Sequence, residues 1–219
     1  MIIDDLITNR TADDVDRVKE LADKGRAGTW TVAEAAEYAA YMTGAYNLTD
    51  VNRVSEAQSY LGTAFSGFVT TLANYRTAAI AAVLASLIFP EGYYNLDSPI
   101  LPAALGQVDY TVPTLGTVKT DWAQDDDLTP STLAYYISNV EKLIAVLDTD
   151  ADIPASLGAL DYIGANEIEA ALTAVYDDYV SYVVTKKGAV DDAKAAAIEK
   201  YHLQDASWWL AGETYAGEI

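Results

Sequence analysis

The chain enters a helix twice with the same pattern of residues. The first copy runs from Asn47 to Val54 and the second from Asp161 to Ile168. Each opens with a polar residue suited to capping a helix, places an asparagine at the same step, and continues with apolar residues three or four positions apart. That spacing puts apolar side chains on one side of an α-helix, so the repeat predicts packed helical units. A weaker third copy begins at Thr129.

The same periodicity predicts a mainly α protein built from helical bundle units. Capping residues, glycines and prolines suggest where each helix begins and ends. Glycines at 62, 67 and 188 predict interruptions between neighbouring helices, and Pro90 predicts a firm stop. The expected helices cover about residues 11–24, 32–41, 49–61, 68–88, 131–147, 164–184 and 190–201.

Two segments differ from this helical pattern. Residues 90–120 are rich in proline and glycine, and residues 107–112 and 117–120 alternate with β-branched side chains, which predicts a small β-hairpin insertion. The glycines and aromatics after Trp208 predict a short extended or hairpin C-terminal tail. We therefore expect an N-terminal helical unit over 1–89, a linker with the hairpin over 90–120, and a C-terminal helical unit with its tail over 121–219.

The charge of the chain restricts its partners. The 219 residues include 33 acidic and 13 basic side chains, for a net charge of −20, and no cysteine. Such a charge repels phosphate backbones and anionic lipid, so we expect neither a nucleic-acid partner nor a membrane partner. The most apolar run, residues 77–89, is shorter than the roughly 20 residues of a spanning helix. It is typical of a helix in a core or a subunit interface, with membrane insertion as the alternative.

No pattern of residues marks a catalytic or metal centre. His202 is the only histidine, whereas a zinc site needs several ligands. Residues 148–152 begin like a calcium loop, but Ile153 stands where the loop requires glycine and Ala159 where it requires glutamate. Phosphate-binding and dinucleotide-binding loops are missing as well. We expect a protein that is not an enzyme and that uses no cofactor or metal.

Four stretches in this order carry a family resemblance. They are residues 5–15, residues 42–54, residues 119–122 with Thr129-Pro130 and the helix behind them, and the helix from Gly164 with the ending from Trp209 to Glu218. Together they resemble small structural proteins encoded in the tail or baseplate region of phages and prophages of Gram-positive bacteria. The resemblance implies a non-enzymatic virion component, made in the host cytoplasm and placed near the host-attachment apparatus.

A virion role would depend on contacts with other virion proteins and with copies of the chain, as a trimer or a hexamer. The expected assembly residues are small or aromatic: Ala81, Ala82, Ala85, Trp208, Trp209 and Tyr215. The alternative is a receptor- or glycan-binding module that uses Tyr93 and Tyr94, or a head-surface or head-fibre protein. At helical spacing, Tyr176, Tyr179 and Tyr182 instead predict a stripe of contacts between helices.

Overall fold

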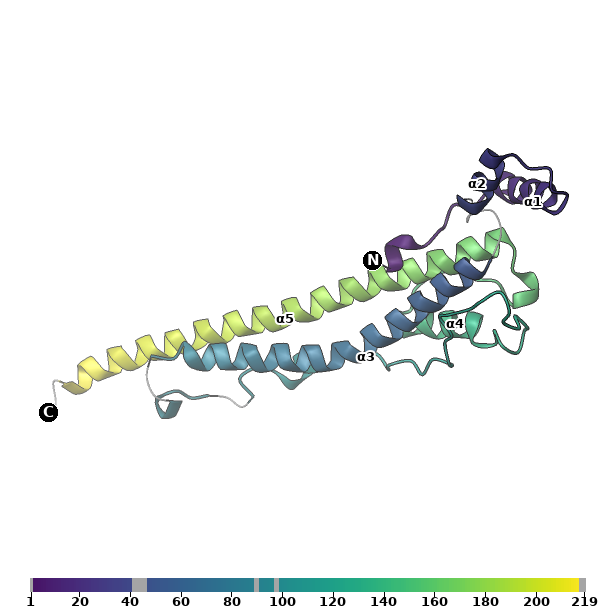
Figure 1. Cartoon of the computed structure of the whole chain (residues 1–219). Coiled ribbons are helices and arrows are strands. Elements are labelled where there is room, and N and C mark those ends of the chain that lie inside the picture. Colours follow the sequence, from purple (N-terminus) through teal and green to yellow (C-terminus); the bar gives the residue numbers. More distant parts are fainter. Residues whose placement is uncertain (1, 41–46, 89–90, 97–98, 217–219) are drawn as a thin grey trace. The chain divides into compact units, whose positions relative to one another are not determined.

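The structure is a computed structural model that describes residues 2–40, 47–88, 91–96 and 99–216, without the side chains of residues 40, 91 and 203–216. Within that part of the chain the regular structure is helical, which confirms the mainly α class (Figure 1). The α-helices are α1 (Ala12–Arg26), α2 (Val32–Ala40), α3 (Leu48–Ala85), α4 (Tyr135–Leu147) and α5 (Tyr162–Ala216). Short 3-10 turns include η1 (Ile2–Asp5) and η3 (Ala103–Gly106).

The chain forms two compact units, and neither is one continuous segment. Unit 1 contains residues 1–65 and 110–179, and unit 2 contains residues 66–109 and 180–219. The units differ from the three consecutive regions that the sequence suggests. The reason is that α3 and α5 each contribute their first part to unit 1 and their remainder to unit 2.

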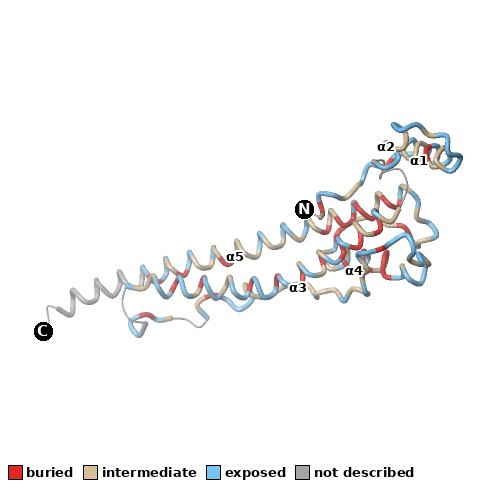
Figure 2. The backbone as a smooth tube through the Cα atoms, in the orientation of Figure 1, coloured by how far each residue is buried: buried red, intermediate tan, exposed pale blue. Residues whose placement is uncertain are grey.

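The core of unit 1 is formed by the first part of α3, by α4 and by the first part of α5. Figure 2 shows the buried residues gathered along these three helices. Their apolar residues recur three or four positions apart, so each helix turns one side to the others. The fully buried members include Val54, Leu61, Phe65, Val140, Leu143, Ile168, Leu172 and Val175.

In unit 1, α3 and α5 run parallel. The rings of Tyr60 and Tyr176 lie 6.2 Å apart, and further along both helices the rings of Phe65 and Tyr179 lie 4.9 Å apart. The Tyr179 hydroxyl donates to the carbonyl of Ala64 at 2.9 Å. The tyrosine stripe is therefore a contact between helices, as predicted. Residues that face each other are about 115 positions apart, as are the two repeated helix entries.

Unit 2 contains the remaining parts of α3 and α5 together with residues 86–109. The rings of Phe68 and Tyr182 lie 5.8 Å apart, edge to face. The Tyr75 hydroxyl donates to Asp191 at 2.6 Å, which holds the pKa of that tyrosine above its ordinary value. Leu101 is fully buried in this unit. The stripe of helix contacts thus includes Tyr182 as well.

Both long helices pass through glycines that the sequence suggests as breaks. α3 continues through Gly62 and Gly67, and α5 continues through Gly188 and through most of the predicted extended tail, to Ala216. The expectation of an extended or hairpin tail is therefore wrong. A glycine inside a helix costs only about 1 kcal/mol relative to alanine, so tertiary packing outweighs it where no proline follows. At Gly62 the packing is close, because a Cβ atom there would lie 2.7 Å from the end of the Leu115 side chain, which would have to move.

The predicted β-hairpin is also wrong. Residues 107–122 contain no strand, and their peptide groups bond to helix side chains instead of to one another. Asn139 receives a hydrogen bond from Gly116 N at 2.8 Å, and Lys142 donates to the carbonyl of Thr114 at 3.0 Å. Buried peptide groups need partners, and here α3 and α4 provide them.

α1 and α2 form a pair with contacts of its own. Thr11 and Asp14 form a capping box at the start of α1. Arg17 bonds to Glu37 at 2.6 Å and Lys24 to Glu34 at 2.6 Å, so two ion pairs join the helices. These predicted helices begin and end within about two residues of the expected positions.

Candidate functional site

The repeated phrases begin helices as their polar residues predict. The Asn47 side chain accepts from Thr49 N at 2.9 Å, and Asn47 N donates to the Asp50 carboxylate at 3.0 Å. The Asp161 side chain accepts from the backbone N–H groups of residues 163 and 164, both at 2.9 Å. These bonds satisfy N–H groups that have no partner in the first turn of a helix.

The asparagine shared by the two phrases has the same task in both. Asn52 bonds to both peptide groups of Trp122, accepting from its N–H at 2.7 Å and donating to its carbonyl at 2.9 Å. Asn166 bonds in the same way to Arg10, accepting at 3.1 Å and donating at 2.9 Å. A side-chain amide offers a donor and an acceptor side by side, so it can bond to the N–H and the C=O of one residue as a neighbouring β-strand would.

A third asparagine makes a looser version of the same pair. Asn139 on α4 accepts from Gly116 N at 2.8 Å and donates to the Gly116 carbonyl at 3.4 Å. Each of the three helices in the core of unit 1 thus holds one non-helical segment by its backbone. These asparagines hold the segments by their peptide groups, and at Asn166 the Arg10 guanidinium also donates to the amide oxygen, at 3.3 Å.

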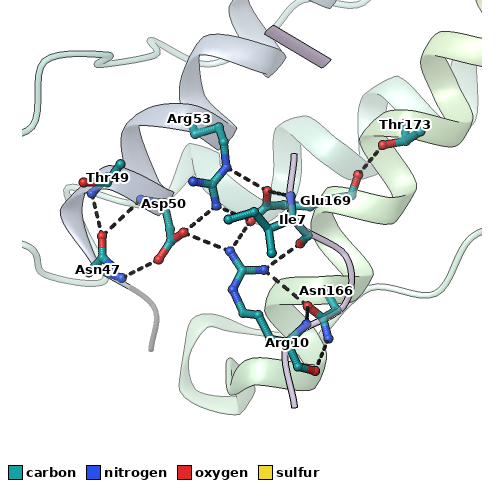
Figure 3. Close-up of polar contacts among 9 residues, drawn as sticks. All are labelled: Ile7, Arg10, Asn47, Thr49, Asp50, Arg53, Asn166, Glu169 and Thr173. Carbon is teal, nitrogen blue, oxygen red and sulfur yellow. Dashed lines mark hydrogen bonds and ion pairs between the residues drawn. The ribbon is translucent and has the colours of Figure 1, made fainter. Parts of the chain in front are cut away.

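Close to Asn166 lies a buried cluster of four charged side chains: Arg10, Asp50, Arg53 and Glu169 (Figure 3). Arg10 Nη2 donates to Asp50 at 2.9 Å and to Glu169 at 2.6 Å, and all three side chains are 0% exposed. Arg53 donates to Glu169 twice, at 2.9 Å each, and also bonds to Asp50. Two guanidinium groups and two carboxylates balance one another, which burial of charge requires.

The hydrogen-bond acceptor positions of the Glu169 carboxylate are all occupied. Its two oxygens receive four hydrogen bonds, three from the guanidinium groups and one from Ile7 N at 2.6 Å. A carboxylate has about four such sites, so this one is saturated. Burial alone lowers the pKa of Arg53, but its bonds to Glu169 and then to Asp50 outweigh burial and raise that pKa. The arrangement suits a structural contact rather than proton transfer.

The residues that the sequence proposes as an assembly interface are only partly described. Ala81, Ala82 and Ala85 are exposed on the part of α3 that belongs to unit 2. The side chains of Trp208, Trp209 and Tyr215 lie outside the described residues.

The two residues of the glycan alternative have different surroundings. Tyr93 is 56% exposed, whereas Tyr94 is 8% exposed. The Tyr94 hydroxyl accepts from Ile88 N at 2.9 Å, and its ring lies 6.2 Å from that of Tyr201. Of this pair, Tyr93 alone offers its ring to a surface ligand.

The part of α3 in unit 2 presents an uncharged face. From residue 57 to residue 90 the only charged side chain is Arg76, which donates to the carbonyl of Leu101 at 2.5 Å. The hydroxyl of Thr77, an exposed residue, donates to a carbonyl of its own helix at 2.9 Å. The uncharged face consists of Val69, Thr70, Thr71, Ala73, Asn74, Thr77, Ala78, Ala81, Ala82, Leu84 and Ala85, all exposed.

Among the described residues, α3 is the one helix long and apolar enough to cross a membrane by length and composition. Only 22% of its most apolar 18-residue stretch is buried. Core helices of soluble proteins meet the same criterion, and the first part of α3 lies in a core. Length and composition therefore do not distinguish membrane insertion of α3 from packing against protein.

Comparisons with protein-family models, with curated proteins and with solved structures find no match to this chain.

Proposed function

We propose that this chain is a non-enzymatic structural subunit that acts by associating with other subunits, in the tail or baseplate region of a phage particle. The observation that carries the association is the uncharged face of α3. The phage setting rests on the family resemblance of the sequence. Expected partners are copies of the chain, as a trimer or a hexamer, and neighbouring virion proteins.

The net negative charge of the chain is the physical reason why association should use this uncharged face. Copies of a protein with a net charge of −20 repel one another over most of their surfaces. The uncharged face lets two copies approach without bringing carboxylates together. Its alanine and threonine side chains are short, so helix axes can come close and bury apolar surface, at roughly 25 cal/mol per Å².

The test is the mass of the protein in solution after a charge is placed on this face. Light scattering behind a sizing column should give an oligomer for the wild type and a smaller species for Ala81→Glu. Ala170→Glu is the matched control, because it places the same charge on an exposed alanine of α5 in unit 1. A wild type that stays monomeric at all concentrations would contradict the proposal, as would flotation with lipid vesicles that Ala81→Glu abolishes.

The phage setting needs a separate experiment. Antibody labelling of particles released from a lysogen that encodes the chain should mark one end of the tail. Labelling of the head would support the head-surface alternative, and unlabelled particles would refute a virion role.

Glycan binding is the second candidate function, favoured by the exposed ring of Tyr93. Binding to host cell-wall polysaccharide that is lost in Tyr93→Ala would support it. Because Tyr93 is a surface residue, this variant should unfold at the same temperature as the wild type.

A further inference from the structure

Residues 2–10, here called the strap, lie against α3 and α5 of unit 1. Ile3 is buried in the core, and Ile2 and Leu6 pack around it. Beyond Ile3, Ile7 contacts the helices through its N–H, and Arg10 contacts them through its N–H, its carbonyl and its guanidinium. Three of these contacts involve peptide groups, and the Arg10 guanidinium supplies a positive charge. The strap is thus held by the burial of its apolar residues and by the bonds of Ile7 and Arg10.

The helices present a prepared site for that charge. Asp50 is fixed by the capping box with Asn47, and Glu169 is fixed by Arg53. Without Arg10, the remaining cluster would keep two carboxylates and one guanidinium, a net negative charge in a position that the strap covers. Asn166 adds a donor and an acceptor for a peptide group. Chemically, the site is a receptor for a non-helical segment that carries an arginine.

The strap is not sealed along its whole length. Ile2 and Asp5 line an open hollow of about 330 Å³ together with four residues of α3. The residues after the strap belong to the α1–α2 pair, which has its own capping box and its own ion pairs. Release of the strap would therefore break the bonds of Ile7 and Arg10 and expose Ile3, without dismantling α1 or α2.

We propose that the receptor formed by Asp50, Asn166 and Glu169 accepts the strap of a second copy, so that subunits join by exchanging straps. This inference rests on the proposed function, because exchange needs copies in contact. A second copy offers the same atoms to the same site, and the bonds gained equal the bonds lost. Whether a strap binds its own chain or a second copy then depends on the local concentration of copies, which rises when subunits assemble.

The first test uses the full-length chain and a fluorescent synthetic peptide with the sequence of residues 2–11. The Arg10→Ala protein, whose own strap is weakened, should bind this peptide. A peptide that carries the same Arg10→Ala change should bind about 100-fold more weakly, the loss expected when a buried charge loses its partner. The Ala170→Glu protein, with its own strap intact, should bind much less peptide. No binding of the native peptide to folded Arg10→Ala protein would overturn the receptor.

Hydrogen exchange on the wild type covers the case in which the Arg10→Ala protein does not fold. If the strap can leave the helices that hold it, the amides of Ile7 and Arg10 must exchange hydrogen faster than those of core residues such as Val175. Equal protection would mean that the strap opens only when the whole unit unfolds, and exchange between copies would be refuted.

The second test separates strap exchange from association in general. Arg10→Ala should shift the wild-type oligomer toward monomers at concentrations where Ala170→Glu leaves it unchanged. If Ala81→Glu dissociates the oligomer and Arg10→Ala does not, strap exchange is wrong while the proposed association stands. If the wild type is monomeric throughout, association fails and strap exchange fails with it.

Discussion

The buried cluster gives the sharpest test of how unit 1 is held together. Replacing Glu169 by glutamine keeps the size of the side chain but removes its charge. The cluster then holds two guanidinium groups against Asp50 alone, with side chains that are almost completely buried. One carboxylate oxygen becomes an amide NH2 group, which donates hydrogen bonds and cannot accept them. Each oxygen accepts two of the four hydrogen bonds to Glu169 (Figure 3), so two of them are lost.

Breaking a buried ion pair by removing one partner costs about 3–5 kcal/mol. Domains of this kind unfold with about 5–15 kcal/mol, so the variant should lose a large part of its stability. Urea unfolding followed by circular dichroism measures the difference. Glu141→Gln is the control, because Glu141 is exposed on α4 and its change should stay within about 0.5 kcal/mol. A loss below about 1 kcal/mol for Glu169→Gln would refute a closed, dry cluster.

Four further outcomes are expected. Asn52→Ala should lower the free energy of unfolding by about 1–3 kcal/mol, because it strands both peptide groups of Trp122, whereas the exposed Asn74→Ala should be nearly neutral, again by urea unfolding. Gly188→Ala should raise it by about 0.5–1 kcal/mol, since a Cβ atom there meets nothing within 4 Å in a helix interior. The Lys24 ammonium and then the Thr31 N–H lower the pKa of Glu34 to about 2. Ionised Glu34 therefore stabilises α2 fully above pH 4.5, and this stabilisation is lost as the pH falls towards 2. An NMR titration of Glu34 should find a midpoint near pH 2, and Lys24→Met should raise that midpoint. Deletion of residues 208–219 should weaken the oligomer, by light scattering, more than it lowers the unfolding temperature.

The helix entries at Asn47 and Asp161 were predictable from sequence, whereas the continuation of α3 and α5 through their glycines was not. Asn47 and Asp161 bond to N–H groups two or three residues away, so a short stretch of sequence contains the whole interaction. By contrast, α3 continues through Gly62, where it packs against Leu115, a residue far along the chain. Local patterns contain no information about such a neighbour.

The same limit explains the wrong hairpin. Alternating β-branched residues in 107–120 favour a strand, but a strand also requires a partner. The partners of this region are Asn139 and Lys142 on a helix, 23 and 28 residues away from the groups that they bind. The buried cluster was hidden for a similar reason, because Arg10 meets Asp50 and Glu169 across 40 and 159 residues. Its only sequence signal is that Asp50 and Arg53 sit three residues apart at a predicted helix start.

A side-chain amide that binds a peptide group is indifferent to which amino acid it holds. Asn52, Asn139 and Asn166 therefore place few demands on the loops that they fix, while they themselves tolerate little change, since aspartate would lack the donor. Descendants of this chain should vary most at exposed loop positions such as Thr111 and Thr117, and should retain the three asparagines. A mutational scan that scores folding should reproduce that contrast, with tolerant loop positions beside intolerant helix positions.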